Sequence, residues 1–167
     1  MDLSKLAPGD AAVALRSFER RYRGLFATLG EDESPDDIAH RRGRGGWSAI
    51  AHVVAAAWAI AACGRALGRV LREDDPEIDA TDVDPALRDR PNDPSGTIHE
   101  RLAELGLEAN ALADVVDKVP AGDWDRLGVV NEGSGRRVSA LDIVRSAVDS
   151  GVTHLRSAER VVDEVRA

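Results

Sequence analysis

The chain has 167 residues, of which 43% are hydrophobic and 31% charged, and its formal net charge at pH 7 is −8. This length fits one domain, residues 1–167, with a substantial core, and the composition is ordinary for a soluble globular protein. Because phosphate binding needs a dominant basic surface, the negative balance argues against a nucleic-acid partner. The lone cysteine, Cys63, excludes an intrachain disulfide and a cysteine-based zinc site.

The N-terminal stretch MDLSKLAPGD lacks the basic and apolar regions of a signal peptide. The apolar stretch over residues 49–64 contains His52 and is followed by Arg65 and Arg69, so it is too short for a membrane span. We therefore expect a cytoplasmic protein without a membrane partner.

The first predicted helix runs from about Gly9 to Leu29, and Gly30 ends it. An acidic run at 31–37 and a basic run at 40–44 follow, and such a pair is typical of a solvated charged loop. The apolar positions of the helix recur at helical spacing: Val13, Leu15, Phe18, Tyr22, Leu25, Phe26 and Leu29.

The second predicted helix begins directly after Trp47, because Ser48 is a good N-cap, and continues to about Arg72. Arginines at three positions share one face, which we expect to be the solvent side. The opposite stripe predicts the buried side: Val53, Ala56, Ile60, Cys63, Leu67 and Val70. His52 lies one turn before Ala56, on or beside this buried stripe.

Residues 73–96 contain four prolines and many aspartates, which predicts a long surface crossover between the second and third helices. The third predicted helix covers about 95–119. A turn and a glycine-rich segment over 120–138 are compatible with a short hairpin. The inward positions of the third helix are Ile98, Leu102, Leu105, Leu112, Val115, Val116 and Val119.

The fourth predicted helix opens with Ser139 as N-cap and Asp142 reaching back in a capping-box arrangement, and it runs to about Val165. Its apolar residues recur at a coiled-coil-like spacing. Four amphipathic helices in one chain predict an all-α four-helix bundle.

Ligand sites in bundles are built from side chains on facing helices, so the histidines inside the predicted bundle are the candidates for chemistry. His154 shares a strip of the fourth helix with Ser146, Ser150 and Ser157. The strip fits either a polar pocket or a flank that faces water, and we favour the flank. His40 and His99 are expected to be exposed.

Several segments of the chain resemble the DinB/YfiT-like superfamily, which includes mycothiol-dependent maleylpyruvate isomerase-type domains. The resemblance rests on GWSAIAHV at the second helix, DWDR after the third and HLRSAERV in the fourth, and it covers nearly the whole chain. It implies a bundle with a long crossover, frequent homodimers and a divalent metal, zinc or nickel, held by three histidines. It also implies transferase or isomerase activity with a low-molecular-weight thiol.

The implied ligand set is incomplete in this chain. The family's first histidine follows the tryptophan of the WS pair by eight residues, and that position is Ala55 here. The other two form an H-x-x-x-H pair on the last helix, which places Ser150 and His154 at those positions. His52 lies one helical turn before Ala55, and a turn is about 5 Å along the axis. Only one implied ligand is therefore present.

Two hypotheses follow. We favour a divergent member whose metal site is largely lost, and which binds a small molecule in a bundle-end pocket or acts as a non-catalytic, stress-associated protein. The pocket candidates are Trp47, His52, Ala55, Ser150 and His154. The alternative is a metal-dependent thiol transferase or isomerase with a shifted site at His52 and His154. A third class, an interaction protein that uses its acidic crossover, is favoured less.

Overall fold

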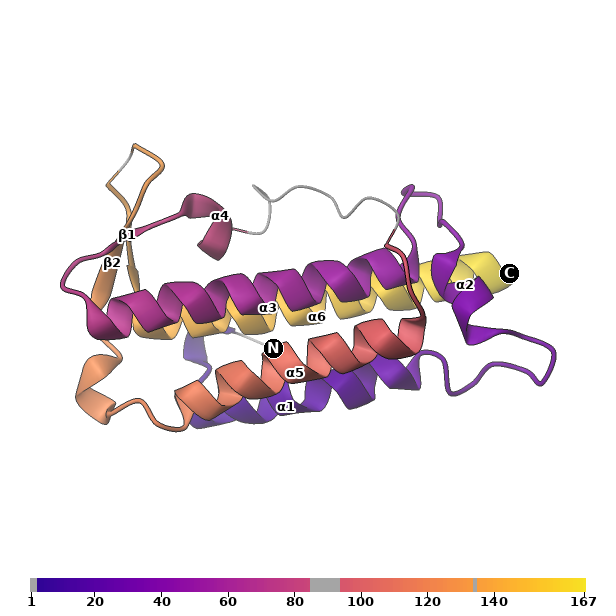
Figure 1. Cartoon of the computed structure of the whole chain (residues 1–167), viewed down its shortest axis with the longest axis horizontal. Coiled ribbons are helices and arrows are strands. Elements are labelled where there is room, and N and C mark those ends of the chain that lie inside the picture. Colours follow the sequence, from indigo (N-terminus) through magenta and orange to yellow (C-terminus); the bar gives the residue numbers. More distant parts are fainter. Residues whose placement is uncertain (1–2, 85–93, 134) are drawn as a thin grey trace.

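Four long helices dominate the computed structural model, which describes residues 3–84, 94–133 and 135–167. They are α1 (Pro8–Gly24), α3 (Ala49–Arg72), α5 (Ile98–Val116) and α6 (Ala140–Arg166). The four helices lie side by side with roughly parallel axes (Figure 1). The predicted all-α four-helix bundle is confirmed.

The charged segment after α1 is more ordered than the sequence analysis predicted. Helix α1 ends at Gly24, several residues before the predicted Leu29. A short helix, α2 (Pro35–His40), then forms where a solvated loop was expected, and its Ile38 is buried. Ser34 accepts a hydrogen bond from the Asp37 amide as N-cap, and a proline occupies the first turn, so the local sequence contains the start signals of a helix.

A small three-stranded sheet lies at the end of the bundle opposite α2 (Figure 1). Strands β2 (Leu127–Val130) and β3 (Arg137–Ser139) pair antiparallel, which confirms the predicted hairpin. Strand β1 (Glu77–Ile78) pairs parallel with β2 and was not predicted.

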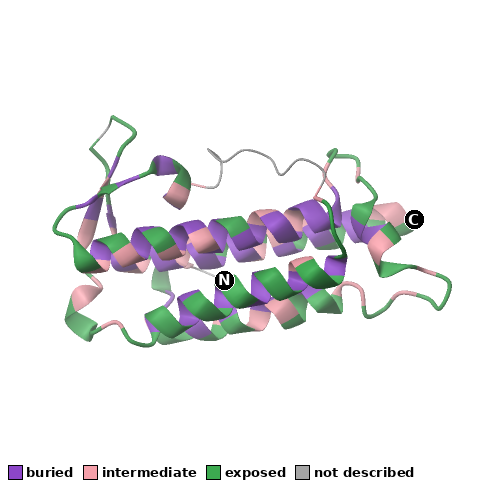
Figure 2. Ribbon diagram, in the orientation of Figure 1, coloured by how far each residue is buried: buried purple, intermediate pink, exposed green. Residues whose placement is uncertain are grey.

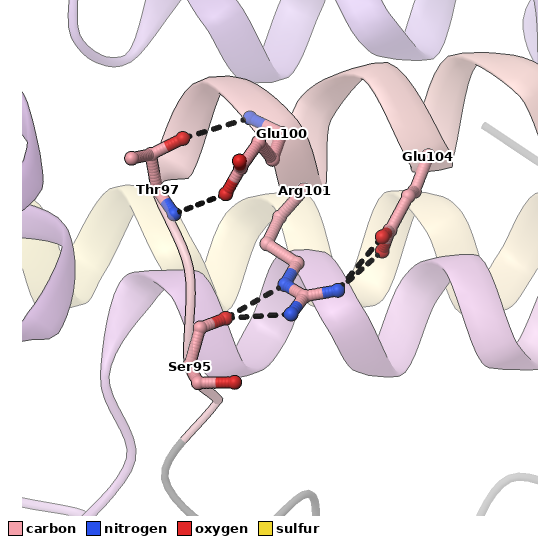
Figure 3. A network of polar contacts seen from close by, with 5 residues as sticks. All are labelled: Ser95, Thr97, Glu100, Arg101 and Glu104. Carbon is pink, nitrogen blue, oxygen red and sulfur yellow. Dashed lines mark hydrogen bonds and ion pairs between the residues drawn. The ribbon is translucent and has the colours of Figure 1, made fainter.

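The crossover from α3 to α5 contains β1 and the short helix α4 (Ala80–Val83), which packs on α3. The predicted long crossover is therefore present in its described parts, and residues 85–93 lie outside the described chain. At its far end, Thr97 and Glu100 form a capping box that begins α5 (Figure 3).

The core lies between the facing sides of the helices, as the burial pattern in Figure 2 shows. Helices α1 and α6 approach closely at Gly151, where an added Cβ would overlap the ring of Phe18. The Tyr22 hydroxyl donates a hydrogen bond to the Gly151 carbonyl oxygen at 2.7 Å. Two predicted core positions were wrong: Val13 is 69% exposed and Val115 40% exposed.

Helices α3 and α6 run antiparallel and make the most extensive contact in the bundle. At one end, Arg126 of the DWDR segment donates to the carbonyl oxygens of Val70 and Glu73, at the end of α3 where the carbonyl groups lack intrahelical donors. At the other end, the first turn of α3 meets α6 near His154. This second end contains the candidate site.

Contrary to the expectation that its apolar stretch is too short, α3 is long and apolar enough to cross a membrane, the one such helix among the described residues, but 72% of its most apolar window is buried inside the bundle. Half of its apolar residues are alanines, and the helix packs against the neighbouring helices. An apolar composition of this kind is therefore also that of a helix in the core of the bundle.

Candidate functional site at the start of helix α3

The loop over residues 41–47 presents Trp47 at the start of α3. The Gly43 amide donates to the Trp47 carbonyl oxygen at 2.9 Å, and the Gly46 amide donates to the Gly43 carbonyl oxygen at 2.9 Å. Gly46 has a φ of 79°, which glycine adopts without strain. Ser48 then caps α3 by accepting a hydrogen bond from the Ala51 amide. Trp47 is thus held between a closed turn and a capped helix.

The same loop is tied to α6. The Arg44 amide donates to the Oε2 atom of Glu164 at 2.9 Å. Gly43 lies against α6 so closely that an added Cβ would be 2.7 Å from Oε2 of Glu164 and 3.1 Å from Cγ2 of Val161. A side chain at this position would push the loop away from the helix.

His52 from the first turn of α3 and His154 from α6 meet beneath Trp47. Their Nδ1 atoms are 3.2 Å apart, which is hydrogen-bond distance. Because a neutral imidazole has one donor and one acceptor nitrogen, one ring donates to the other. The Trp47 ring stacks on His52 with centroids 4.7 Å apart, and it lies nearly parallel to His154 at 6.0 Å. All three side chains are half-buried.

A cavity of about 350 Å³ opens beside these rings. Its walls combine the aromatic group with a polar face of α6. The lining residues are Gly45, Trp47, His52, Thr153, His154, Ser157, Arg160, Val161 and Glu164. We refer to this cavity as the Trp47 pocket.

Two of the predicted pocket residues lie one turn deeper in the bundle and do not line the Trp47 pocket. Ala55 is half-buried on α3. Ser150 is only 2% exposed, and its hydroxyl has no hydrogen-bond partner among the described residues. The expectation that the serine strip forms a flank facing water was therefore wrong. Ser146 is also partly buried, and its hydroxyl donates to the Val83 carbonyl oxygen.

No protein-family model matches the chain, and no curated protein matches its sequence. Among solved structures, YfiT from Bacillus subtilis is similar, with a TM-score of 0.68 over 92% of this chain and 86% of that chain, at 14% identity. That protein is described as a probable metal-dependent hydrolase with an unusual four-helix bundle topology. The chain has the DinB/YfiT-like fold. At this identity the similarity establishes the fold alone.

The residues of this DinB/YfiT-like chain do not fit a resident metal held by three histidines. Ala55 and Ser150 stand where the resemblance implies two of the imidazoles, and neither is an imidazole ligand. Among the residues with described positions, no group of three or more histidines, cysteines or carboxylates is arranged to hold an ion. Glu164 lines the pocket but follows His154 by ten residues, which is about 15 Å along a helix.

The sequence analysis did not single out Arg160 or Glu164, which line the Trp47 pocket. The available signal was spacing: Thr153, Ser157, Arg160 and Glu164 recur at intervals of four, three and four residues, which places them on one helical face. That pattern is common on exposed helices. In this protein the face forms a pocket wall because the loop at 41–47 packs beside it.

Proposed function

We propose that this DinB/YfiT-like protein binds a small molecule in the Trp47 pocket without a three-histidine metal centre. The observation that carries the proposal is the convergence of Trp47, His52 and His154 on one cavity from two helices and a closed loop. A volume of about 350 Å³ is at the lower end of the range for small-molecule sites, which is roughly 300–1,000 Å³. The ligand is therefore small.

The chemistry of the pocket supports binding of a partly apolar ligand with polar groups. Trp47 offers an aromatic surface, and aromatic surfaces contribute strongly to binding when they are held rigidly. The histidine pair adds two imidazole rings to the cavity wall, and imidazole nitrogens can donate or accept hydrogen bonds. Such a pair can also hold or release a proton, so the proposal includes binding with or without catalysis.

A second candidate is a metal-dependent thiol transferase or isomerase whose shifted site uses His52 and His154. One observation favours it. Zinc–nitrogen bonds of about 2.0–2.1 Å at a tetrahedral angle place two ligand nitrogens about 3.3 Å apart, and the two Nδ1 atoms are 3.2 Å apart. Two imidazoles nevertheless fall one short of the three protein ligands usual at a catalytic zinc site.

Elemental analysis of untagged protein, purified without chelator, separates the two candidates. Our proposal predicts less than about a tenth of an equivalent of zinc or nickel, and no rise in melting temperature on adding Zn²⁺, because an ion that binds the native state must stabilise it. Stoichiometric metal that is lost in His154→Ala would overturn the metal-free proposal. His99→Ala is the matched control, since His99 is exposed and does not line the pocket.

Ligand binding is tested with a fragment library balanced in charge, using NMR of the ¹⁵N-labelled full chain. Fragments that occupy the pocket shift the indole N–H signal of Trp47. This signal is assigned by its loss in the Trp47→Phe variant. Trp58, 52% exposed on α3, provides the control signal. A library that moves neither the Trp47 signal nor the imidazole signals of His52 and His154 contradicts the proposed function. The cytoplasmic location and the homodimer remain predictions.

A further inference from the structure

The arginines with described positions fall into two groups, those with a partner among the described residues and those without one. Arg101 belongs to the first: its guanidinium donates to the Ser95 carbonyl oxygen and to both carboxylate oxygens of Glu104 (Figure 3). This arrangement occupies the guanidinium and fixes the entry into α5. A guanidinium of this kind has little capacity left for a ligand.

Arg160 belongs to the second group, and it is the arginine that lines the Trp47 pocket. It is exposed and makes no hydrogen bond or ion pair with any residue of the described chain. The carboxylate that lines the same cavity is Glu164, one turn further along α6. The Oε2 atom of Glu164 is occupied by the Arg44 amide. The pocket wall therefore includes a guanidinium without a partner among the described residues.

Hydroxyl donors lie on the same face of α6 as Arg160. Thr153 and Ser157 precede it by seven and three residues, and both line the cavity. Donors at these spacings point to one side of a helix. A guanidinium with neighbouring hydroxyls suits a planar oxyanion, because the guanidinium can donate two parallel hydrogen bonds to a carboxylate.

From this arrangement we infer that the ligand is a small organic carboxylate with a planar apolar body. This inference rests on the proposed function, since it names the ligand class of the same pocket. The carboxylate is bound by Arg160 and the hydroxyls of α6, and the apolar body lies against Trp47 and Val161. The overall charge of −8 does not oppose this, because solvent-exposed charges beyond about 8–10 Å are screened at physiological salt.

Three probes of one shape and different charge test the inference: benzoate, benzamide and benzamidine. Each is titrated into the full-length protein while the Trp47 indole signal is followed. We expect benzoate to bind at least about tenfold more tightly than benzamide, which corresponds to about 1.4 kcal/mol, and benzamidine to bind most weakly. Arg160→Gln should reduce benzoate affinity by about tenfold and leave benzamide affinity unchanged.

Arg156→Gln is the matched control. Arg156 is also exposed on α6 and has no partner in the described chain, but it does not line the cavity. Equal binding of benzoate and benzamide, tighter binding of benzamidine, or an equal loss in Arg156→Gln would overturn the carboxylate inference. In each of these cases the Trp47 signal still moves, so the proposed function stands. If no probe and no library fragment shifts the Trp47 signal, both the carboxylate inference and the proposed function are overturned.

Discussion

Ser150 provides the sharpest test of how the interior of this bundle differs from a metal-binding one. Its hydroxyl is buried without a partner in the described chain, at a position where the resemblance implies a metal ligand. A buried hydroxyl without a hydrogen bond costs about 1–3 kcal/mol. We therefore expect Ser150→Ala to stabilise the protein.

The expected change in the free energy of unfolding of Ser150→Ala is the sum of two stabilising effects and one destabilising effect. Removal of the unpaired hydroxyl gains about 1–3 kcal/mol, and alanine adds up to about 0.5 kcal/mol of helix propensity. The loss is the packing of one oxygen atom. We expect a net increase of about 1–2 kcal/mol in the free energy of unfolding. For a chain of this length, the melting temperature rises by about 2–4 °C per kcal/mol.

Urea unfolding followed by far-ultraviolet circular dichroism measures this change. If the free energy of unfolding falls with urea concentration at the same slope in Ser150→Ala and in the parent protein, the two unfold between comparable states. Ser146→Ala is the matched control one turn away, because the Ser146 hydroxyl donates to the Val83 carbonyl oxygen at 3.0 Å. We expect this control to be neutral or destabilising by up to about 1 kcal/mol. If Ser150→Ala is as destabilising as Ser146→Ala, the Ser150 hydroxyl has a partner in solution, and the reasoning is refuted.

Three further outcomes are expected. Gly43→Ala should weaken the nuclear Overhauser contact between the Trp47 and His52 rings, because the added Cβ would lie 2.7 Å from a Glu164 oxygen and displace the loop. Tyr22→Phe should lower the free energy of unfolding by about 1–2 kcal/mol, measured by urea unfolding, since the lost hydroxyl donates within the core. Glu33→Gln should lower the melting temperature more at pH 7 than at about pH 3: because the pKa of Glu33 is lowered in the folded protein, its stabilising effect declines as pH falls below its ordinary value of 4.5.

Each of these three predictions has a control variant or an outcome that would contradict it. Gly45→Ala, where an added Cβ meets nothing within 4 Å, should leave the Trp47 contact intact. A Tyr22→Phe protein as stable as the parent would show that the hydroxyl gains nothing from its bond in the core. For Glu33, the depressed pKa comes from the Gly30 amide and then from Arg166, so an equal effect of the substitution at both pH values would contradict this assignment.

The long helices were predictable because their signals are local. Ser48 and Ser139 cap the helices that the sequence places after them, and helical spacing of apolar residues identified the buried face of α3. The exposure of Val13 could not be predicted, because the apolar positions of an isolated helix do not specify which of them a neighbouring helix covers. Strand β1 was missed for a related reason: a two-residue strand forms only because a distant strand pairs with it.

The candidate site was predictable only in its parts. Sequence analysis identified Trp47, His52 and His154, but whether the two imidazoles meet depends on how α3 and α6 slide past each other. Sliding one helix along the other by one turn would shift residues that face each other by about 5 Å along the axis. The structure resolves this by placing the Nδ1 atoms 3.2 Å apart. Arg160 became visible as a pocket residue only through the loop that packs beside α6.

The position of a histidine along α3 decides what it can do in this bundle. Ala55 is half-buried one turn further along α3 and does not line the cavity, and Ser150 on α6 is only 2% exposed. At position 52, an imidazole instead lies beneath Trp47 and beside the cavity. The loop over residues 41–47 therefore completes the site by adding Gly45 and Trp47 to the side chains of α3 and α6. Proteins that share only the four helices share the scaffold, and the chemistry has to be inferred from this loop and the side chains that it covers.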